Sequence, residues 1–256
     1  MARLRPQPPH SILITGASSG IGAALARRYA RADVHLALGG RDPDRLATTA
    51  AACRQAGASV TVQSVDVTDR QAMAAWIGSV DRDAPLDLVI ANAGTSGRHL
   101  PDGPERTRAI FAVNLDGLLN TIEPAEAAML ARGHGHLALM SSLASFFGSP
   151  SAAAYRSSKA AVRLLGEGLR TRLVREGIVV SVICPGFIRT PMNAGVRPRL
   201  PFALSAEQAA AIIERGVARG KARIAFPSVT YLAVRVLADL PPGLAGQLSA
   251  RPSDKA

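Results

Sequence analysis

A tyrosine and a lysine four residues apart form a pair that could carry proton-transfer chemistry. Tyr155 and Lys159 begin a stretch with helical periodicity, so we expect their side chains to share one face. An ammonium beside a phenol stabilises the phenolate and lowers its pKa, which brings the group closer to general acid–base use. Lys159 is one of only three lysines, while the other 27 basic residues are arginines. The pair therefore predicts an acid–base centre, and a packing tyrosine beside a solvated lysine is the alternative.

Two further polar residues could belong to the same site. Ser142 ends a short apolar run and lies thirteen residues before Tyr155, where its hydroxyl could donate to a carbonyl oxygen as charge develops there. Ser141 is the alternative, and two serines that bond nearby backbone are the simpler interpretation. Asn114 lies inside a predicted helix over 104–131, where asparagine is unfavourable unless something requires it. A tolerated surface asparagine is its alternative.

A glycine-rich turn follows the first apolar run and leads into a helix from Ala23. It reads Gly16-Ala-Ser-Ser-Gly20-Ile-Gly22, with the spacing G-x-x-x-G-x-G. Glycines at such a turn let the backbone approach a pyrophosphate, and the helix N-terminus offers free N–H groups and partial positive charge. We therefore predict a phosphate-binding loop made by Gly16, Ser18, Ser19, Gly20, Ile21 and Gly22.

The elements that must position these residues are short apolar runs alternating with helical segments. The runs, which do not alternate with polar residues as half-exposed strands do, cover 11–15, 34–38, 60–65, 86–91, 136–140, 178–183 and 223–226. This order predicts an α/β fold: a doubly wound, parallel, seven-stranded sheet with helices on both faces, in a single domain. Ligands of such sheets bind beyond the carboxyl ends of the strands, where the residues above lie.

The motifs together resemble the classical short-chain dehydrogenase/reductase family. TGASSGIG at 15–22, NAG at 92–94, SS at 141–142, YRSSK at 155–159 and PG at 185–186 match its order and spacing over about residues 10–227. The resemblance implies a Rossmann-type fold and hydride transfer between a nicotinamide and a carbonyl or secondary alcohol carbon. It implies that Tyr155 moves the proton, Lys159 tunes it and holds the ribose, and Ser142 polarises the oxygen. Asn114 would lie at a distorted helical turn and hold a water of a proton relay.

The resemblance also implies further cofactor contacts at the strand ends. Asp66, with Val67 beside it, would contact the adenine, and Asn92, Ala93 and Gly94 would border its ribose. Residues after the sixth strand would position the nicotinamide carboxamide: Pro185, Gly186, Ile188 and Thr190.

The choice of cofactor depends on the end of the second predicted strand. Position 40 is glycine, where NAD-type members tend to carry aspartate, and Arg41 follows, as in many NADP-type members. Asp42 is explained as the cap of a helix that starts at Pro43. We therefore predict NADP. Other NADP-type members carry a basic residue in the glycine loop, where this sequence has Ser19. NAD therefore stays the alternative.

Composition limits the other classes of function. The chain has 256 residues, 48% of them hydrophobic, which is enough for one substantial core. The two cysteines, Cys53 and Cys184, predict buried thiols in a reducing compartment, and the lack of an apolar leader or spanning run predicts a cytoplasmic protein. The net charge is +11, but the arginines are dispersed and aromatics are 4%, which argues against nucleic-acid binding. His134 and His136 have no evident third partner, so no metal is expected.

The substrate region and the C-terminus carry weaker signals. Apolar residues after the fifth and sixth strands suggest an apolar or lipid-like carbonyl or alcohol: Leu143, Phe146, Phe147, Phe187 and Met192. Residues 195–205 are expected to form a mobile flap. We divide the chain into a catalytic domain, 1–227, and an amphipathic extension of the same domain, 228–256.

The apolar stripe of this extension comprises Val229, Leu232, Val236 and Leu240. We expect it to pack on the pocket's rim or on another subunit, in a homodimer or homotetramer, ahead of peripheral contact with a membrane. A non-catalytic dinucleotide-binding sensor or scaffold is the rival of the whole enzymatic interpretation.

Overall fold

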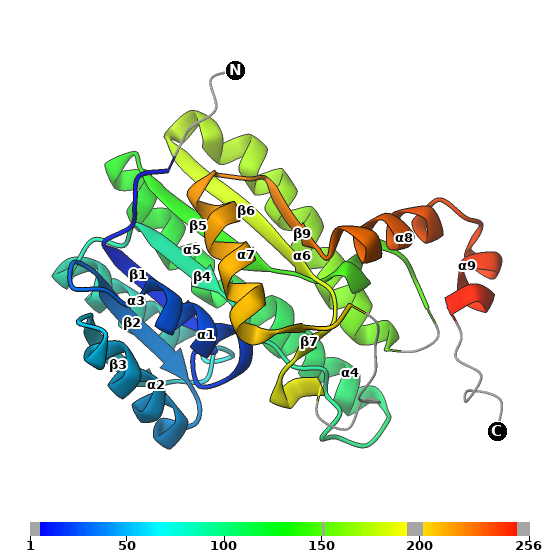
Figure 1. Ribbon diagram of the computed structural model, residues 1–256, viewed down its shortest axis with the longest axis horizontal. Helices are drawn as coiled ribbons and strands as arrows, with labels where there is room; N and C mark the ends of the chain where they lie inside the picture. Colours follow the sequence, from blue (N-terminus) through cyan, green and yellow to red (C-terminus); the bar gives the residue numbers. More distant parts are fainter. Residues whose placement is uncertain (1–5, 150–151, 194–201, 250–256) are drawn as a thin grey trace.

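The fold is a seven-stranded parallel sheet covered by helices on both faces (Figure 1). The computed structural model describes residues 6–149, 152–193 and 202–249. The strands lie in the order β3-β2-β1-β4-β5-β6-β9, and each neighbouring pair is parallel. Their bounds are β1 (Ser11–Thr15), β2 (His35–Gly40), β3 (Ser59–Ser64), β4 (Leu88–Ala91), β5 (Gly135–Met140), β6 (Ile178–Pro185) and β9 (Arg223–Phe226). The predicted fold class is confirmed.

Two apolar clusters hold the helices to the sheet. Along β1, Ile12 and Ile14 face one cluster while Leu13 faces the other, because successive side chains of a strand point to opposite faces. The first cluster packs under α1 (Gly20–Tyr29), α2 (Pro43–Gln55) and α7 (Ala206–Ala218). The second packs under α3 (Arg70–Asp83), α5 (Gly117–Arg132) and α6 (Ala153–Leu173). The helices packed on both faces hold the sheet together, and the carboxyl ends of its parallel strands form one edge.

Local signals mark the helix ends, and the predicted cap at Asp42 is confirmed. The Asp42 carboxylate accepts a hydrogen bond from the Arg45 amide at 3.0 Å and so caps α2. Ser205 and Gln208 form a capping box at the start of α7. Gly177, just after α6 and a short 3₁₀ turn (Val174–Glu176), has a φ of +78°, a conformation that favours glycine.

The predicted burial of the third strand is wrong. Thr61, Val62 and Gln63 of β3 are exposed. β3 lies at the edge of the sheet, where one side of the strand has no neighbour and only part of a face is covered. The apolar residues correctly predict a strand here, but the exposure of its side chains depends on the position of the strand in the sheet.

The flap predicted over 195–205 lies mostly outside the described residues. Its described end includes β8 (Leu204–Ser205), which pairs in parallel with β7 (Ile188–Arg189) in a separate two-stranded sheet. A 3₁₀ turn (Pro191–Asn193) follows β7.

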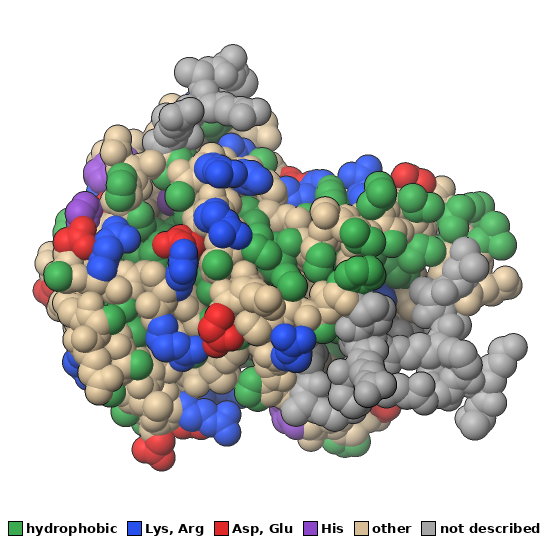
Figure 2. Space-filling view, viewed as in Figure 1, with side chains coloured by type: hydrophobic (Ala, Val, Ile, Leu, Met, Phe, Trp, Pro, Cys, Tyr) green, Lys and Arg blue, Asp and Glu red, His purple; other side chains and the backbone are tan. Residues whose placement is uncertain are grey.

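The packing of the C-terminal stripe on the pocket's rim that we expected is wrong within this chain, whereas its packing on another subunit stays a prediction. The extension forms α8 (Ser228–Ala238) and α9 (Pro242–Ser249), with the predicted break at the prolines between them. The side chains of Val229, Leu232 and Val236 are 58%, 68% and 58% exposed, so the apolar stripe faces solvent. Hydrophobic side chains therefore cover the outer surface of α8 (Figure 2). Tyr231, which is not part of that stripe, packs inward against the cluster of Leu143, Val182 and Cys184.

Candidate active site

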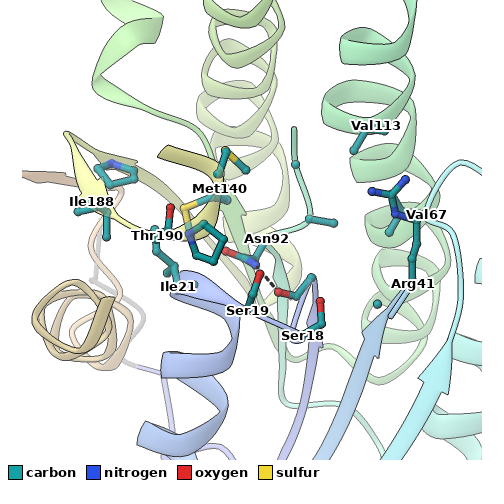
Figure 3. Close-up of a pocket in the computed structure, with 18 of the residues that line it drawn as sticks. Ser18, Ser19, Ile21, Arg41, Val67, Asn92, Val113, Met140, Ile188 and Thr190 are labelled. Atoms are coloured by element: carbon teal, nitrogen blue, oxygen red, sulfur yellow. Dashed lines mark hydrogen bonds between the residues drawn. The ribbon is translucent and has the colours of Figure 1, made fainter. Parts of the chain in front are cut away.

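One cavity of about 390 Å³ runs along the carboxyl edge of the sheet. Figure 3 shows Arg41 and Val67 at one end of it and Thr190, Ile188 and Met140 at the other. Most residues predicted to hold a dinucleotide line this cavity: Gly16, Ser18, Ser19, Gly20, Ile21, Arg41, Asp66, Val67, Asn92, Ala93, Gly94, Tyr155, Lys159, Pro185, Gly186, Ile188 and Thr190. Ser142 lines it as well. Gly22 and Asn114 are not among the lining residues. Gly22 packs against Gly16, and Asn114 bonds Thr95 in the loop after β4.

The glycine turn presents backbone to the cavity. α1 begins at Gly20, and within the described chain its cap residue Ser19 makes no side-chain bond to the first helical amides. These amides are therefore available to an anion at the helix N-terminus. A Cβ at position 22 would lie 2.1 Å from the Gly16 carbonyl oxygen, so only glycine allows this close packing. The turn has the open, side-chain-free surface that a pyrophosphate needs.

The Asn92 side chain holds this turn in place. Its Nδ2 donates to the carbonyls of Thr15 at 2.9 Å and Gly16 at 3.3 Å. Its backbone amide donates to the Thr15 hydroxyl at 3.1 Å. Asn92 thus ties the end of β4 to the end of β1, and it shapes the cavity as well as lining it.

Two arginines stand at the end of the cavity formed by β2 and β3. Arg41 lies 3.9 Å from the Asp66 carboxylate, and Arg45 lies 3.1 Å from that of Asp42. Both side chains are about two-thirds exposed, at 67% and 63%. Exposed pairs of this kind are weak, so either guanidinium can turn to another anion at little cost. Sequence reasoning missed Arg45, although its position four residues after Arg41 on the first turn of α2 was the available signal.

Ser142 and Tyr155 meet at the opposite end of the cavity. The Ser142 hydroxyl lies at the end of β5, accepts from the Ala144 amide at 3.1 Å and donates to the Pro185 carbonyl at 3.4 Å. Ser141, the alternative candidate, instead donates to the Lys159 carbonyl at 2.7 Å. Both serines line the cavity, but the Ser141 hydroxyl is engaged in anchoring α6.

The pKa of Tyr155 moves in the direction opposite to the one expected. Burial raises the pKa of this phenol above 10, while a hydrogen bond with Ser142 and the charge of Arg156 lower it in part. The Lys159 ammonium instead donates to the Met140 carbonyl at 2.9 Å. In this structure the neutral phenol, the form that can give up a proton, is favoured.

Lys159 is a buried cation, with 3% of its surface exposed. Burial lowers the pKa of Lys159 to about 8, an effect that the nearby Cys184 opposes. Its ammonium has three donors, one of which is used by Met140. The group is therefore placed to donate to a ligand in the cavity.

Asn114 lies in a π-helical turn, Ala112–Asp116, that interrupts the predicted helix between α4 (Pro104–Phe111) and α5. Its side chain bonds the Thr95 amide at 2.7 Å, the Thr95 carbonyl at 3.0 Å and the Ser158 hydroxyl at 3.0 Å. It thus connects the loop after β4 to α6, and the side chain is fully used by protein groups. Such a π turn loosens the backbone hydrogen bonds around it and is frequent at functional sites.

Gly94 separates Asn114 from Lys159. A Cβ at this position would lie 3.1 Å from the Asn114 Oδ1 and 3.2 Å from the Lys159 Nζ. Both groups therefore lie beside the Gly94 backbone. A larger residue at this position would crowd the Lys159 ammonium.

Of the five residues predicted to bind substrate, only Met192 lines the cavity, and Phe187 is 41% exposed outside it. The cavity is also lined by Val113, Met140 and Pro191, which sequence reasoning missed. Phe146 and Phe147 instead lie under arginines of α6, with guanidinium carbons 4.6 Å and 4.5 Å from the ring centroids. Leu143 is buried behind the site. These three residues support the loop rather than line the cavity.

Three other sequence features have structural roles. Cys53 and Cys184 are buried free thiols. His136 is buried and bonds Ser181 at 2.9 Å, and burial lowers its pKa to about 3. Within residues 6–149, 152–193 and 202–249 no three His, Cys, Asp or Glu side chains gather as a metal site would require. The helices of the same residues include none with the length and apolarity to span a bilayer.

Comparison with known proteins assigns the chain to a family. The family model described as short chain dehydrogenase matches residues 10–201. An uncharacterized oxidoreductase of Myxococcus xanthus is 36% identical over 234 residues, which cover 90% of this chain and 92% of that protein. The 1-deoxy-11-beta-hydroxypentalenate dehydrogenase of Streptomyces exfoliatus is 35% identical over 190 residues, 72% of this chain and 69% of that one.

A solved structure agrees with this assignment. The short-chain dehydrogenase of Sphingobium yanoikuyae, in complex with NADPH, has a TM-score of 0.78 and 28% identity. The match covers 96% of this chain and 98% of that one. With the cavity and the motifs described above, these matches lead to one conclusion: the chain belongs to the short-chain dehydrogenase/reductase family and is an oxidoreductase that acts on CH–OH groups.

Proposed function

We propose that this protein is an NADP-dependent oxidoreductase that transfers hydride between the nicotinamide and a carbonyl or secondary alcohol carbon of an apolar or lipid-like substrate. One observation carries the proposal. A single cavity joins the two arginines at one end to Ser142, Tyr155 and Lys159 at the other. A dinucleotide that lies along the glycine turn would place its anionic adenosine end at the two arginines. Its nicotinamide would then lie beside Ser142, Tyr155 and Lys159.

The arginine end supports NADP rather than NAD. Arg41 and Arg45 both line the cavity, and position 40 is a glycine that offers no carboxylate to a ribose 2′-hydroxyl. A guanidinium can bind a phosphate with two parallel hydrogen bonds, and two of them can share one phosphate. The NADPH complex of the Sphingobium relative is consistent with this choice. NAD use by the same fold is the alternative that the assay below compares.

At the other end, each side chain has a distinct task in the reduction of a carbonyl. NADPH, when bound, supplies the hydride. The Ser142 hydroxyl donates to the substrate oxygen as negative charge develops on it. Tyr155, whose pKa is raised by burial, holds a proton at neutral pH and gives it to the same oxygen. In the oxidation of an alcohol Tyr155 accepts that proton instead.

Lys159 and Asn114 act around Tyr155. The buried ammonium of Lys159 has donors left for a ribose hydroxyl of the cofactor. Asn114 fixes the wall around the lysine through its bonds to Thr95 and Ser158. The loosened backbone of its π turn is where a relay water would be held.

The substrate end favours apolar molecules. Val113, Met140 and Met192 line the cavity together with Ser142 and Tyr155. Contact with these side chains stabilises an apolar substrate in proportion to the area removed from water. The polar groups then act on one oxygen, which is the pattern of a site selective for a single carbonyl on an apolar skeleton.

We further propose that the protein is cytoplasmic and acts as a homodimer or homotetramer, with no nucleic acid as partner. Both cysteines, Cys53 and Cys184, are buried free thiols, which suits a reducing compartment. Light scattering on the purified chain measures the oligomer, and a monomeric mass at micromolar concentration would contradict this part.

A panel of ketones, aldehydes and secondary alcohols, followed at 340 nm with NADPH/NADP⁺ and with NADH/NAD⁺, tests the proposal. We expect turnover of apolar ketones with a preference for NADPH. Preference for NADH would refute the cofactor assignment. Tight cofactor binding without turnover of any member would favour a dinucleotide-binding sensor.

A further inference from the structure

The turn that begins at Ser142 is held in place from outside the cavity by a cluster of aromatic and arginine side chains. Ser142 is the first residue of this turn: its hydroxyl accepts from the Ala144 amide, and its carbonyl accepts from the Ser145 amide at 3.1 Å. Ser142 therefore caps the 3₁₀ turn Leu143–Phe146, and Phe146 ends it. Movement of Phe146 would be transmitted to Ser142 through one short turn.

Phe146 is enclosed by three side chains from three different elements. The guanidinium carbons of Arg163 on α6 and Arg223 on β9 lie 4.6 Å and 5.3 Å from its ring centroid. The Tyr231 ring of α8 meets it edge to face, with centroids 5.4 Å apart at an interplanar angle of 67°. Edge-to-face pairs and cations over a ring face are the favourable geometries of an aromatic quadrupole.

Hydrogen bonds join these side chains into one unit. Arg223 donates to the Tyr231 hydroxyl at 3.0 Å and pairs with Glu167, which also pairs with Arg163 at 3.4 Å. Arg163 in turn donates to the Ser145 carbonyl at 3.4 Å. The cluster thus contacts both the backbone and the ring of the Ser142 turn.

Tyr231 is the contribution of the C-terminal helix to this cluster. α8 lies wholly within the described residues, and it buries none of its side chains completely. Among its inward contacts are those of Tyr231 and Val234 with the cluster beside the turn. Its neighbours Leu232 and Val236 face solvent. A helix that adds so little to the core, yet reaches the turn of an active-site serine, is placed to position that turn.

We propose that Tyr231, acting through Phe146, is a positioning residue that holds the turn of Ser142 in its reactive geometry. The inference rests on the proposed role of Ser142 in polarising the substrate oxygen. A contact that only stabilised the fold would change the melting temperature without changing how much turnover depends on Ser142.

The experiment compares Tyr231→Ala with two matched variants of the same helix region. Leu232→Ala removes an adjacent side chain that is 68% exposed, and Tyr231→Phe keeps the ring and loses the hydroxyl. Phe146→Leu breaks the contact from the other side and serves if Tyr231→Ala does not fold. Circular dichroism first establishes that each variant is folded at the assay temperature.

Hydrogen exchange measures whether the turn is held, independently of activity. We expect the amides of Ala144 and Ser145 to exchange at least about 10-fold faster in Tyr231→Ala, because local opening becomes easier, and to be unchanged in Leu232→Ala. Tyr231→Phe should show an intermediate rate. Unchanged exchange of both amides in Tyr231→Ala would overturn the proposal.

A double-mutant cycle measures whether the effect passes through Ser142. We expect Tyr231→Ala to lower kcat about 10-fold in the wild-type background but less than about 2-fold in the Ser142→Ala background, with the Kd of NADPH unchanged. Equal losses in both backgrounds would refute the positioning role. If the wild type turns over no carbonyl, the proposed function fails, and the exchange rates alone decide whether Tyr231 holds the turn.

Discussion

Selection of NADPH should depend on Arg41 and Arg45. A hydrogen bond to a charged group contributes about 1.5–3 kcal/mol, and the exposure of both side chains favours the lower end of that range. A loss of about 1.5 kcal/mol corresponds to about a 10-fold rise in the Kd of NADPH for Arg41→Ala, and similarly for Arg45→Ala. The double variant should lose somewhat less than about 100-fold, because both arginines would bind one phosphate. The Kd of NADH should change little in any of them.

Calorimetric or fluorescence titration of both cofactors measures these constants. Arg70→Ala is the matched control: it removes one exposed arginine, which pairs with Glu123 and does not line the cavity, and so lowers the net charge equally. A similar loss of NADPH affinity in Arg70→Ala would mean that general charge attraction is at work. Equal losses for NADPH and NADH in Arg41→Ala would show that this residue only shapes the loop.

Three further predictions concern buried charge, proton transfer and the C-terminus. Burial lowers the pKa of Lys159 from 10.5 to about 8, so the unfolded chain binds this proton more tightly, and the unfolding free energy should rise by up to about 3 kcal/mol between pH 8 and 10.5; urea unfolding should show this rise in the wild type and not in Lys159→Met. Arg156 lowers the pKa of Tyr155, so Arg156→Gln should move the rise of alcohol oxidation with pH to higher pH, and an unmoved profile would contradict that coupling. Truncation after Pro227 removes a helix that buries little, so the melting temperature should fall by only a few degrees while kcat falls with the loss of Tyr231; aggregation of the truncated chain would instead favour a covering role for the tail.

Much of the architecture could be predicted because its signals are local. The apolar runs placed all seven strands, the Asp42-Pro43 pair marked the start of α2, and Ser205 with Gln208 formed the expected capping box. The glycine turn could be predicted because its backbone conformation and close packing require glycine at positions 16, 20 and 22. The same motifs placed Ser142, Tyr155 and Lys159 around one cavity.

The features that sequence reasoning missed depend on contacts between distant segments. The exposure of β3 follows from its edge position, which a list of strands does not contain. Tyr231 bonds Arg223 and packs on Phe146, contacts between distant segments that the periodicity of α8 does not contain. The raised pKa of Tyr155 likewise follows from burial, while spacing alone suggested the influence of Lys159.

The central claim is that Tyr155 moves the proton of a hydride-transfer reaction, and Tyr155→Phe tests it most directly. The substitution removes one hydroxyl and leaves the ring, so the cavity and the Kd of NADPH should be preserved. We predict that kcat for reduction of an apolar ketone, followed at 340 nm, falls by about 100-fold or more. Turnover within a few-fold of the wild type, with NADPH bound equally well, would contradict the account.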